Sequence, residues 1–417
     1  MESFKNKKIM IVNSDFSPSG GAEWIAYKTY KILKESGIDA YFFASNRQPF
    51  FEADYEFKDY FTRFIGNTKQ YLKNPFKYYF NTEAQRDFQK FVNKINPDII
   101  HLHSFRVTMT SSILKICENI PTIMTVHDAG IICPAGTLMY KAKNICKNKE
   151  CLGGKYIHCL QNKCCGNNLE INLRKTLRAY IFRNQYQKYI DQYITPSNAL
   201  KLEIINANIG IDNSDISTIN NFLSNEEFET SPNYSNKGFF LYIGRLSKEK
   251  GLNYLLEALR DLPRAINLKI VGTGEEENKL KQYAKENNLY NVEFTGFKNR
   301  NDIKEYYQNC IATILPCNWF ENFPTTTMES FINGKPVIAS KLGGLIEQIE
   351  HNKTGLLFEP TNVAQLKECI LLYANDNRIV TQHGKNAYEY ARKKFSEERY
   401  LEELLFVYET SLNKENI

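Results

Sequence analysis

The chain has 417 residues, of which 42% are hydrophobic and 24% are charged, and its formal net charge is +6. This composition is typical of a folded globular protein, and the length is enough for two domains with separate cores. No apolar run approaches the roughly 18–20 residues that cross a bilayer. The polar start of the chain, 1–8, does not resemble a signal peptide, so we expect a cytoplasmic protein.

The charge is divided unevenly along the chain. Residues 1–195 contain 28 Lys or Arg and 17 Asp or Glu, which gives +11, and the remainder contains 25 and 30, which gives −5. A basic first half favours an anionic partner such as a lipid diphosphate, a membrane surface or a nucleic acid. Solvated helices of a lysine-rich chain explain the imbalance equally well.

The first half opens with a strand at 8–12, a glycine loop at 13–21, a helix at 22–35 and a strand at 39–43. This order is the beginning of a doubly wound α/β domain. Further buried strands are predicted at 99–102, 122–126, 193–195 and 216–219.

Two of these strand ends carry candidate site residues. Gly20 and Gly21 start the first helix, whose first turn contains Glu23. His127 and Asp128 end the strand at 122–126, where a His-Asp pair favours a role in a site over simple packing. For His103, after the strand at 99–102, we expect a structural or acceptor-side role.

An aromatic stretch at 50–80 contains 12 Phe or Tyr interleaved with basic residues. Core packing on one face of a helix is the simplest interpretation of Phe57, Tyr60, Phe61 and Phe64. The remaining rings, with Lys69, Lys73 and Lys77, would suit an anionic membrane surface. No RNA-binding motif accompanies them, so we expect no nucleic acid.

A cysteine-rich segment at 133–165 has little apolar content to bury. Its spacing, Cys146-x4-Cys151-x7-Cys159-x4-Cys164, predicts a structural zinc site of four thiolates. The intervals of four residues differ from the usual two. Free thiols, an iron–sulfur cluster or a disulfide therefore stay open as alternatives.

The second half repeats the strand–loop–helix–strand order after a polar linker at 223–236. The loop at 244–251 follows a buried strand, and Arg245 and Lys250 in it are suited to binding phosphate. Gly272 and Phe297 follow the next strands of this half, where a nucleotide base would lie. The predicted strands are 239–243, 267–271, 292–294, 312–315 and 337–339, and the predicted helix is 252–259.

Residues 316–347 are the most informative segment. Glu321 precedes a helix that Pro324 opens as its first residue, and Glu329 lies inside that helix. Free N–H groups at the helix start attract anions, so two carboxylates beside them suggest a ligand rich in both hydroxyls and negative charge. A nucleotide sugar is such a ligand.

This segment resembles the E-x7-E signature of the retaining GT-B glycosyltransferases of family 4, and the resemblance extends along most of the chain. It implies two doubly wound, Rossmann-like α/β domains facing across a cleft. The acceptor domain would be 1–222 and the nucleotide-sugar domain 237–394, with a terminal helix at 395–417 crossing back to the first domain. It also implies transfer from a nucleotide-diphosphate sugar to a glycan acceptor in bacterial surface-polysaccharide synthesis. We expect that acceptor to be lipid-linked.

The resemblance also implies roles for single residues. Arg245 and Lys250 would bind the donor diphosphate, Glu329 the ribose, and Glu321 the donor sugar beside the amides of Asn322, Phe323, Pro324 and Thr325. Gly20 and Gly21 would lie beside the diphosphate, and His127 would contact the sugar near the reacting carbon, with Asp128 orienting it. The resemblance implies that the leaving phosphate takes the acceptor proton, so no general base is assigned; Glu23, on the acceptor side, and Asp128 are the candidates.

No Asp-x-Asp occurs in the sequence, so we expect no catalytic metal. Two other functions stay open. One is a nucleotide-sugar epimerase or hydrolase on the same fold, which would turn over the donor without an acceptor. The other is a non-catalytic, zinc-stabilised binding protein, which would bind nucleotide without turnover.

Overall fold

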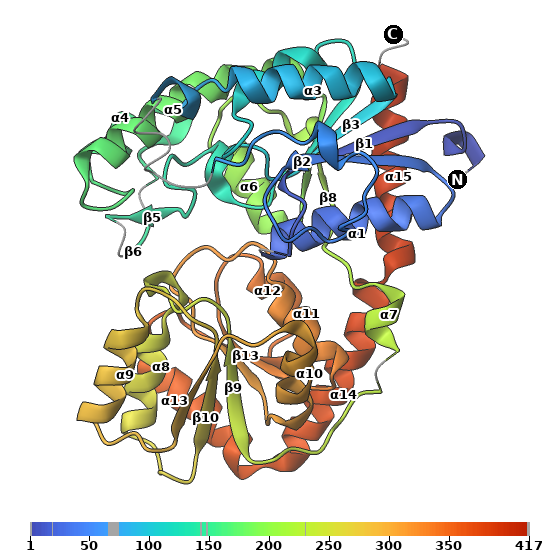
Figure 1. Ribbon diagram of the computed structural model, residues 1–417. Coiled ribbons are helices and arrows are strands. Elements are labelled where there is room, and N and C mark those ends of the chain that lie inside the picture. The colour runs from blue at the N-terminus through green and yellow to red at the C-terminus, as the bar shows by residue number, and fades with distance from the viewer. Residues whose placement is uncertain are drawn as a thin grey trace. The chain divides into compact units, whose positions relative to one another are not determined.

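The computed structural model describes residues 2–18, 20–65, 75–141, 144–146, 149–229 and 231–414 (Figure 1). Residue contacts divide the chain into two compact units. The first comprises Met1–Ala142, Cys146–Asn221 and Glu397–Ile417, and the second comprises Lys143–Ile145 and Phe222–Ser396. The final helix therefore belongs to the first unit, although it follows the second unit in sequence.

The first unit is built on a parallel six-stranded sheet in the order β2-β1-β3-β4-β7-β8. Nearly every strand residue is buried, as expected for a parallel sheet covered on both faces. Parallel strands all end at the same edge, so the loops that follow them meet there. The strands are β1 (Lys8–Asp15), β2 (Asp39–Ser45), β3 (Ile99–Leu102), β4 (Thr122–Thr125), β7 (Gln192–Thr195) and β8 (Ile216–Thr218).

Helices cover both faces of this sheet. On one face α1 (Gly21–Glu35) meets the final helix α15 (Glu397–Lys414), where Thr29 Oγ1 and Tyr400 OH are 2.8 Å apart. The opposite face carries α3 (Thr82–Ile95), the 3₁₀ helix η4 (Ser111–Cys117) and α5 (Leu169–Tyr189) (Figure 1). Shorter helices are α4 (Ile157–Gln161) and α6 (Asn198–Asn206).

The second unit has a parallel sheet of the same size, in the order β11-β10-β9-β12-β13-β14. Figure 1 shows α8, α9 and α13 on one side of this sheet and α10, α11 and α14 on the other. Its strands are β9 (Phe239–Ile243), β10 (Asn267–Val271), β11 (Val292–Gly296), β12 (Thr313–Leu315), β13 (Val337–Ser340) and β14 (Gly355–Phe358). Its helices are α7 (Asn225–Phe228), α8 (Leu252–Arg260), α9 (Glu277–Glu286), α10 (Arg300–Asn309), α11 (Thr325–Ile332), α12 (Leu345–Gln348), α13 (Val363–Asn375) and α14 (Asn377–Lys394).

The apolar residues of the second unit explain this layering. Leu255, Leu256 and Leu259 of α8 are buried against Leu366 and Ile370 of α13 and the sheet. On the other side, Met328 and Phe331 of α11 pack with Ala387 and Ala391 of α14. The helical spacing of these residues gives each helix one buried stripe. The two doubly wound α/β units predicted from the sequence are confirmed.

The predicted strands are confirmed, with ends that differ by at most three residues. The sequence analysis did not predict β14, nor the two-stranded sheet of β5 (Met139–Tyr140) and β6 (Asn144–Ile145) in the cysteine-rich segment. The residues predicted as a linker include the short helix α7, whose first turn is closed by a capping box between Ser224 and Glu227. Very short apolar runs beside Gly or Asn give too weak a periodic signal for a strand to be predicted.

The helical face predicted for Phe57, Tyr60, Phe61 and Phe64 is wrong. This segment contains only the three-residue 3₁₀ turn η2 (Lys58–Tyr60), because Thr62 pairs with the end of β2 through backbone hydrogen bonds of 2.9 and 3.1 Å. Phe61 is nevertheless buried against Phe16, as the core interpretation required. Lys69 and Lys73 lie outside the described residues.

Candidate functional site

Four loops of the second unit approach one another at the carboxyl ends of neighbouring strands. A Cβ atom on Gly251, which has φ 72°, would lie 1.9 Å from the carbonyl oxygen of Pro316. A Cβ on Gly272, at φ 134°, would lie 2.0 Å from the Gly244 oxygen, and one on Gly343 would lie 2.1 Å from the Glu321 oxygen. Only glycine fits such contacts at positive φ. These glycines therefore hold the loops after β9, β10, β12 and β13 together.

Lys250 and Glu321 form an ion pair in the centre of these loops. Trp319 Nε1 donates a 2.7 Å hydrogen bond to the same carboxylate, and the Lys250 ammonium lies 5.0 Å from the Trp319 ring centroid. Burial opposes the charged form of Lys250, but the Glu321 carboxylate outweighs it, so the Lys250 pKa is raised. Lys250 is thus held as a cation beside Glu321.

Arg245 lies on the same loop with its side chain 63% exposed. Its guanidinium donates a 2.9 Å bond to Glu249, whose carboxylate also accepts a 2.6 Å bond from Ser247 Oγ. Burial raises the Glu249 pKa, but the hydrogen bonds from Ser247 and from the backbone N–H of Glu249, together with Arg245, lower it by more, so the net shift is downward. Glu249 therefore orients Arg245 while leaving most of the guanidinium accessible.

The helix α11 begins at Thr325, and Pro324 is its N-cap rather than its first residue, one position from the prediction. Glu329 lies within the helix and accepts a 2.8 Å hydrogen bond from the buried hydroxyl of Tyr307 on α10. Asn322 and Phe323, which precede the helix, are buried. The loop into the helix is fixed by a 2.8 Å bond from Gly344 N to Glu321 O and a 3.2 Å bond from Gln348 Nε2 to Pro324 O.

Phe297, after β11, is 78% exposed. It follows Gly296, which bonds to Gly272 through a 2.9 Å backbone contact. An exposed ring at the end of a strand offers a flat apolar surface for a planar ligand group. The structure thus places Gly272 and Phe297 on adjacent strand-end loops.

In the first unit, His101 lies within β3, and His103 and His127 follow β3 and β4. His103 Nδ1 and His127 Nε2 are 2.9 Å apart, and their rings stack with centroids at 5.2 Å. His101 bonds Tyr408 of α15 and Thr125 of β4, each at 2.7 Å, which is a structural role. Burial lowers the His127 pKa to about 4 and the His101 pKa to about 3, and it also lowers that of His103. All three rings are therefore neutral at pH 7.

Asp128 accepts hydrogen bonds from Arg106, which follows β3, and from the Gly130 backbone N–H at 2.7 Å. A Cβ on Gly130 would lie 1.9 Å from an Arg106 nitrogen, so glycine makes room for the guanidinium. Burial lowers the Arg106 pKa, but Asp128 and Tyr186 raise it further, so the net shift is upward. The sequence analysis assigned Asp128 to orienting His127, and the structure also gives it this ion pair with Arg106.

These side chains line one pocket of the first unit. Its wall combines Glu23 of α1, Arg106, His127 and Asp128 with Lys175 and Arg178 of α5. Three cations against two carboxylates make the pocket basic. Burial raises the Glu23 pKa, although a backbone hydrogen bond to its own N–H lowers it in part. Glu23 lies within the first turn of α1, directly after Gly20 and Gly21.

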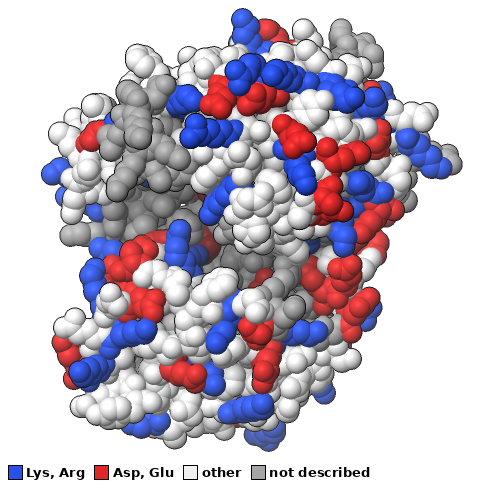
Figure 2. Space-filling view, viewed as in Figure 1, with Lys and Arg blue, Asp and Glu red and all other residues white. Residues whose placement is uncertain are grey.

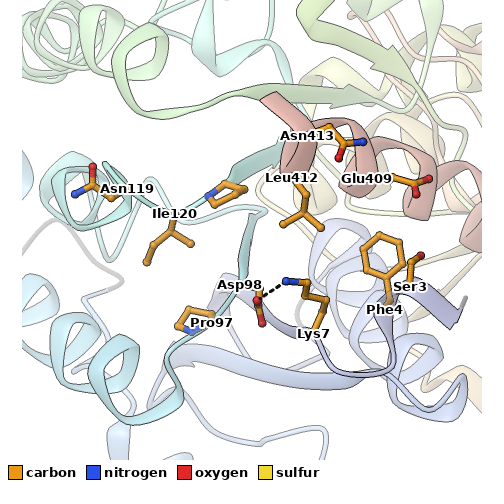
Figure 3. A pocket seen from close by; sticks show the side chains of 11 residues that line it. Ser3, Phe4, Lys7, Pro97, Asp98, Asn119, Ile120, Glu409, Leu412 and Asn413 are labelled. Atoms are coloured by element: carbon orange, nitrogen blue, oxygen red, sulfur yellow. Dashed lines mark hydrogen bonds and ion pairs between the residues drawn. The ribbon is translucent and has the colours of Figure 1, made fainter. Parts of the chain in front are cut away.

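A second pocket of the first unit lies at the opposite edge of the sheet, where the strands begin (Figure 3). Lys7 and Asp98 form an ion pair of 2.9 Å in its wall. Ligands of doubly wound sheets bind at the carboxyl ends of the strands. This pocket therefore does not belong to the candidate site, because its charges are paired and it lies at the edge where the strands begin.

The cysteine-rich segment gathers its sulfurs around Cys159. Cys159 Sγ lies 3.9 Å from Cys165 Sγ, and hydrogen bonding to Cys159 lowers the pKa of Cys164 to about 6 and also lowers those of Cys151 and Cys165. All ten cysteines are free of disulfides. In the part of the chain that the structure describes, no three His, Cys, Asp or Glu side chains have the arrangement of a metal site. The gathered set includes Cys165, which the zinc prediction omitted, and Cys146 lies near Cys151 and Cys164.

The sequence analysis missed several residues of both units. Trp319 lies within the 316–347 segment, where an aromatic residue two positions before Glu321 was a readable signal. No local sequence signal indicated the other four, because their partners are distant in sequence: Arg106, Lys175, Arg178 and Tyr307. Among the described helices, none is long and apolar enough to span a bilayer.

Two family models and several known proteins match this chain. The family model "Glycosyltransferase Family 4" matches residues 19–227, which is half of the chain, and "Glycosyl transferases group 1" matches 224–394. An uncharacterised glycosyltransferase of Methanocaldococcus jannaschii is 32% identical over 177 residues, 42% of this chain and 49% of that protein. A Campylobacter jejuni enzyme named N,N'-diacetylbacillosaminyl-diphospho-undecaprenol alpha-1,3-N-acetylgalactosaminyltransferase is 31% identical over 39% of this chain and 42% of its own length.

The fold has a counterpart in solved structures. Anabaena HepE, solved in complex with UDP-glucose, superposes with a TM-score of 0.63 at 20% identity, over 97% of this chain and 99% of that one. At this identity the likeness shows the fold alone. Since one family model matches half of the chain and the other most of the remainder, the chain belongs to the family 4, group 1 glycosyltransferases.

Proposed function

We propose that the protein is a retaining glycosyltransferase that moves a sugar from a nucleotide-diphosphate sugar to a glycan acceptor bearing an anionic, lipid-linked group. The observation that carries this proposal is the cluster at the strand ends of the second unit. There a cationic Lys250 and an accessible Arg245 lie near the start of α11, with the carboxylates of Glu321, before that helix, and Glu329, within it.

The donor site follows from charge and hydrogen-bonding capacity. Lys250 and Arg245 supply positive charge to a diphosphate, and the amides at the start of α11 add partial positive charge. Glu329, braced by Tyr307, accepts from ribose hydroxyls, and Glu321 accepts from the donor sugar. Phe297 stacks on the base beside Gly272. The UDP-glucose complex of HepE supports this class of donor.

Chemistry at this site needs no enzymic nucleophile. The bond from the anomeric carbon to the phosphate oxygen breaks, the acceptor oxygen bonds to the same face of that carbon, and the leaving phosphate takes the acceptor proton. Lys250 and Arg245 stabilise the charge that develops on the leaving group. His127, neutral at pH 7, contributes hydrogen bonding near the reacting carbon and adds no charge.

The acceptor class follows from the basic pocket of the first unit. Arg106, Lys175 and Arg178 suit a phosphate or diphosphate on the acceptor, while Glu23 receives hydrogen bonds from its hydroxyls. Burial raises the pKa of Glu23, and Asp128 is paired with Arg106, so Glu23 is the carboxylate of this pocket that is open to the acceptor. The printed name of the Campylobacter relative contains a diphospho-undecaprenol acceptor, which supports this class. Bacterial surface-polysaccharide synthesis at the inner face of the membrane is the setting we propose.

Calorimetry with UDP-, GDP-, ADP- and dTDP-sugars tests the donor site. Arg245→Ala and Glu329→Ala should each weaken donor binding by roughly 10- to 150-fold, the effect of losing a charge-assisted hydrogen bond. Arg260→Ala, an exposed arginine paired with Asp261 at the end of α8, is the matched control and should bind as the wild type does. Unchanged affinity in both site variants would remove these residues from the site.

Turnover separates the three functions that the sequence left open. Release of sugar or an epimerised donor without any acceptor would indicate a hydrolase or epimerase. Tight nucleotide binding without turnover would indicate a binding protein. Transfer should persist during brief exposure to EDTA if no catalytic metal takes part, and a requirement for added Mg²⁺ or Mn²⁺ would contradict that expectation.

A structural zinc in the cysteine-rich segment stays a prediction. Sulfurs gathered at Cys159 supply the right kind of ligand, but they do not stand in the arrangement of a metal site. Elemental analysis of the purified protein should find about one zinc per chain, and none after Cys151→Ser with Cys159→Ser. Absence of zinc from the wild type would leave these cysteines as free thiols.

A further inference from the structure

The helix α5 carries large apolar residues on its exposed side as well as on its buried side. It buries Asn172, Thr176, Phe182 and Tyr186 against the first unit. Its outward face carries large apolar side chains at helical spacing, each 38–65% exposed: Leu169, Leu173, Leu177, Tyr180 and Ile181. A contiguous apolar stripe of this kind on a surface marks an interaction site.

Neighbouring elements extend this surface. Ile157 on α4, which packs beside α5, is 45% exposed, and Tyr180 meets Tyr156 edge-on at 5.1 Å. The 3₁₀ helix η3 (Pro75–Tyr78) reaches α5 through Tyr78, whose ring lies 4.6 Å from the Arg178 guanidinium. Phe76 on η3 is 81% exposed. The end of the aromatic stretch predicted as a membrane surface thus reaches α5.

Basic residues flank the apolar stripe. From Leu169 to Tyr189 the helix contains five Lys or Arg and a single acid, Glu170, which is paired with Arg174; Lys188, near its end, is paired with Glu118 at 3.3 Å. Over much of the face that Figure 2 shows, basic and acidic side chains are interspersed. Lys77, one of the lysines predicted to meet lipid, is already paired with Glu83 at 2.7 Å. A local basic helix, rather than the average charge of the first half, therefore provides complementarity to anions.

We propose that the outward face of α5, with Phe76 and Ile157 beside it, docks onto an anionic lipid bilayer. A helix with one apolar face and basic flanks lies in the plane of the interface, with its apolar side chains among the acyl chains and its cations at the headgroups. Lys and Arg near such a surface are attracted to it over about 8 Å at physiological salt. The face of α5 has both properties.

The position of this helix adds a consequence that rests on the proposed function. Lys175 and Arg178, on the flank of the stripe, also line the basic pocket with Glu23 and His127. A lipid-linked acceptor held in the bilayer would reach this pocket with its phosphate first. The same helix would then serve as both anchor and entrance.

Vesicle co-sedimentation tests the docking face directly. The probes are vesicles of phosphatidylglycerol with phosphatidylcholine, and vesicles of phosphatidylcholine alone. Leu173→Asp with Leu177→Asp should lower partitioning into the anionic vesicles about 30-fold, because two side chains lose their apolar burial. The matched control is Leu202→Asp with Leu372→Asp, two exposed leucines on α6 and α13, and it should partition as the wild type does.

Two further readouts keep the outcomes distinct. Donor calorimetry on the α5 variant should match the wild type, which shows that the fold and the donor site are intact. Higher salt should release most of the wild type from anionic vesicles, and the neutral vesicles should bind it weakly. If both leucine pairs behave alike, or the wild type does not sediment at low salt, the proposal is wrong. Self-association of the wild type that the α5 variant abolishes, with vesicle binding unchanged, would assign this face to a second copy instead.

Discussion

One glycine in each unit leaves no room for a side chain, but the atom that a Cβ would meet is backbone in one unit and side chain in the other. A Cβ on Gly251 in the second unit would lie 1.9 Å from the Pro316 backbone oxygen, and a Cβ on Gly130 in the first would lie 1.9 Å from an Arg106 side-chain nitrogen. A backbone carbonyl fixed in a sheet loop cannot move aside, whereas the end of an arginine can. The proposed donor region is therefore held by backbone contacts that cannot adjust, and the proposed acceptor region is held by side chains that can.

The largest loss of stability is expected from a substitution in the rigid loops of the second unit. Gly251→Ala should destabilise the protein by about 3–5 kcal/mol, because positive φ and overlap with Pro316 act together. Gly238→Ala is the matched control, since Gly238 has φ 75° but nothing within 4 Å of a Cβ, so only about 1–2 kcal/mol of backbone strain is expected. Urea unfolding measures both variants. Equal losses would show that the contact with Pro316 does not constrain the loop.

The Lys250–Glu321 pair should show the next largest effect. Lys250 and Glu321 have side chains only 23% and 12% exposed, so Lys250→Met, which leaves the carboxylate without its cation, should cost about 2–3 kcal/mol. In a double-mutant cycle with Glu321→Gln, the coupling energy should exceed 1 kcal/mol.

The control cycle uses Lys279 and Glu276, a pair at 2.7 Å whose lysine is 73% exposed. Its coupling should stay below about 1 kcal/mol, the usual value for exposed pairs. Comparable coupling in the two cycles would mean that the strand-end loops do not shield their ion pair from water.

The sequence predicted these two regions unequally, and their construction explains why. Glu321, Pro324 and Glu329 lie within nine residues, and Arg245 and Lys250 lie on one loop, so their spacing alone indicated a site. The wall of the first-unit pocket draws Glu23, Arg106, Asp128 and Lys175 from four distant segments. A pair such as Arg106–Asp128, 22 residues apart, leaves no local pattern. In the sequence, this region was indicated only by the candidate residues that follow the carboxyl ends of the predicted strands.

The same limit explains the error at 57–64. Aromatic residues at helical spacing also fit an extended segment that pairs with β2, and the choice depended on Thr62 meeting Ala44 and Asn46. At α5 the helical periodicity corresponds to a real helix. Only the structure, however, reveals which of its faces is buried.

Acidification should destabilise the first unit, because three histidines that burial keeps neutral lie in or shortly after its strands β3 and β4. His101 and His127 have pKa values lowered from an ordinary 6.5 to about 3 and about 4 by burial. Below pH 6.5 the unfolded chain takes up protons that the folded chain does not, so stability falls as the pH drops toward 4. At pH 5.5 each histidine should cost about 1.4 kcal/mol.

Urea unfolding at pH 7.5 and 5.5 measures this loss. His101→Gln should be less stable than the wild type at pH 7.5, because Tyr408 and Thr125 lose a well-placed partner, but it should lose less on acidification. A pH dependence that is the same in both proteins would mean that His101 is not buried in the neutral form.

The smallest expected effect tests whether the acceptor region adjusts. Gly130→Ala should change the free energy of unfolding by less than about 1 kcal/mol, since Arg106 can rotate away from the new methyl group. The same rotation separates the guanidinium from Asp128 and from the pocket, so the KM for an anionic acceptor should rise up to about tenfold. Donor affinity should not change, because the proposed donor residues Arg245, Lys250 and Glu329 belong to the second unit and Gly130 to the first. Arg106→Ala should reproduce the rise in KM without any added methyl group, which identifies the guanidinium as the cause. A loss of stability like that of Gly251→Ala would instead show that Arg106 is as fixed as a backbone carbonyl. The first-unit pocket would then be as rigid as the donor loops, and an acceptor would have to fit it without adjustment.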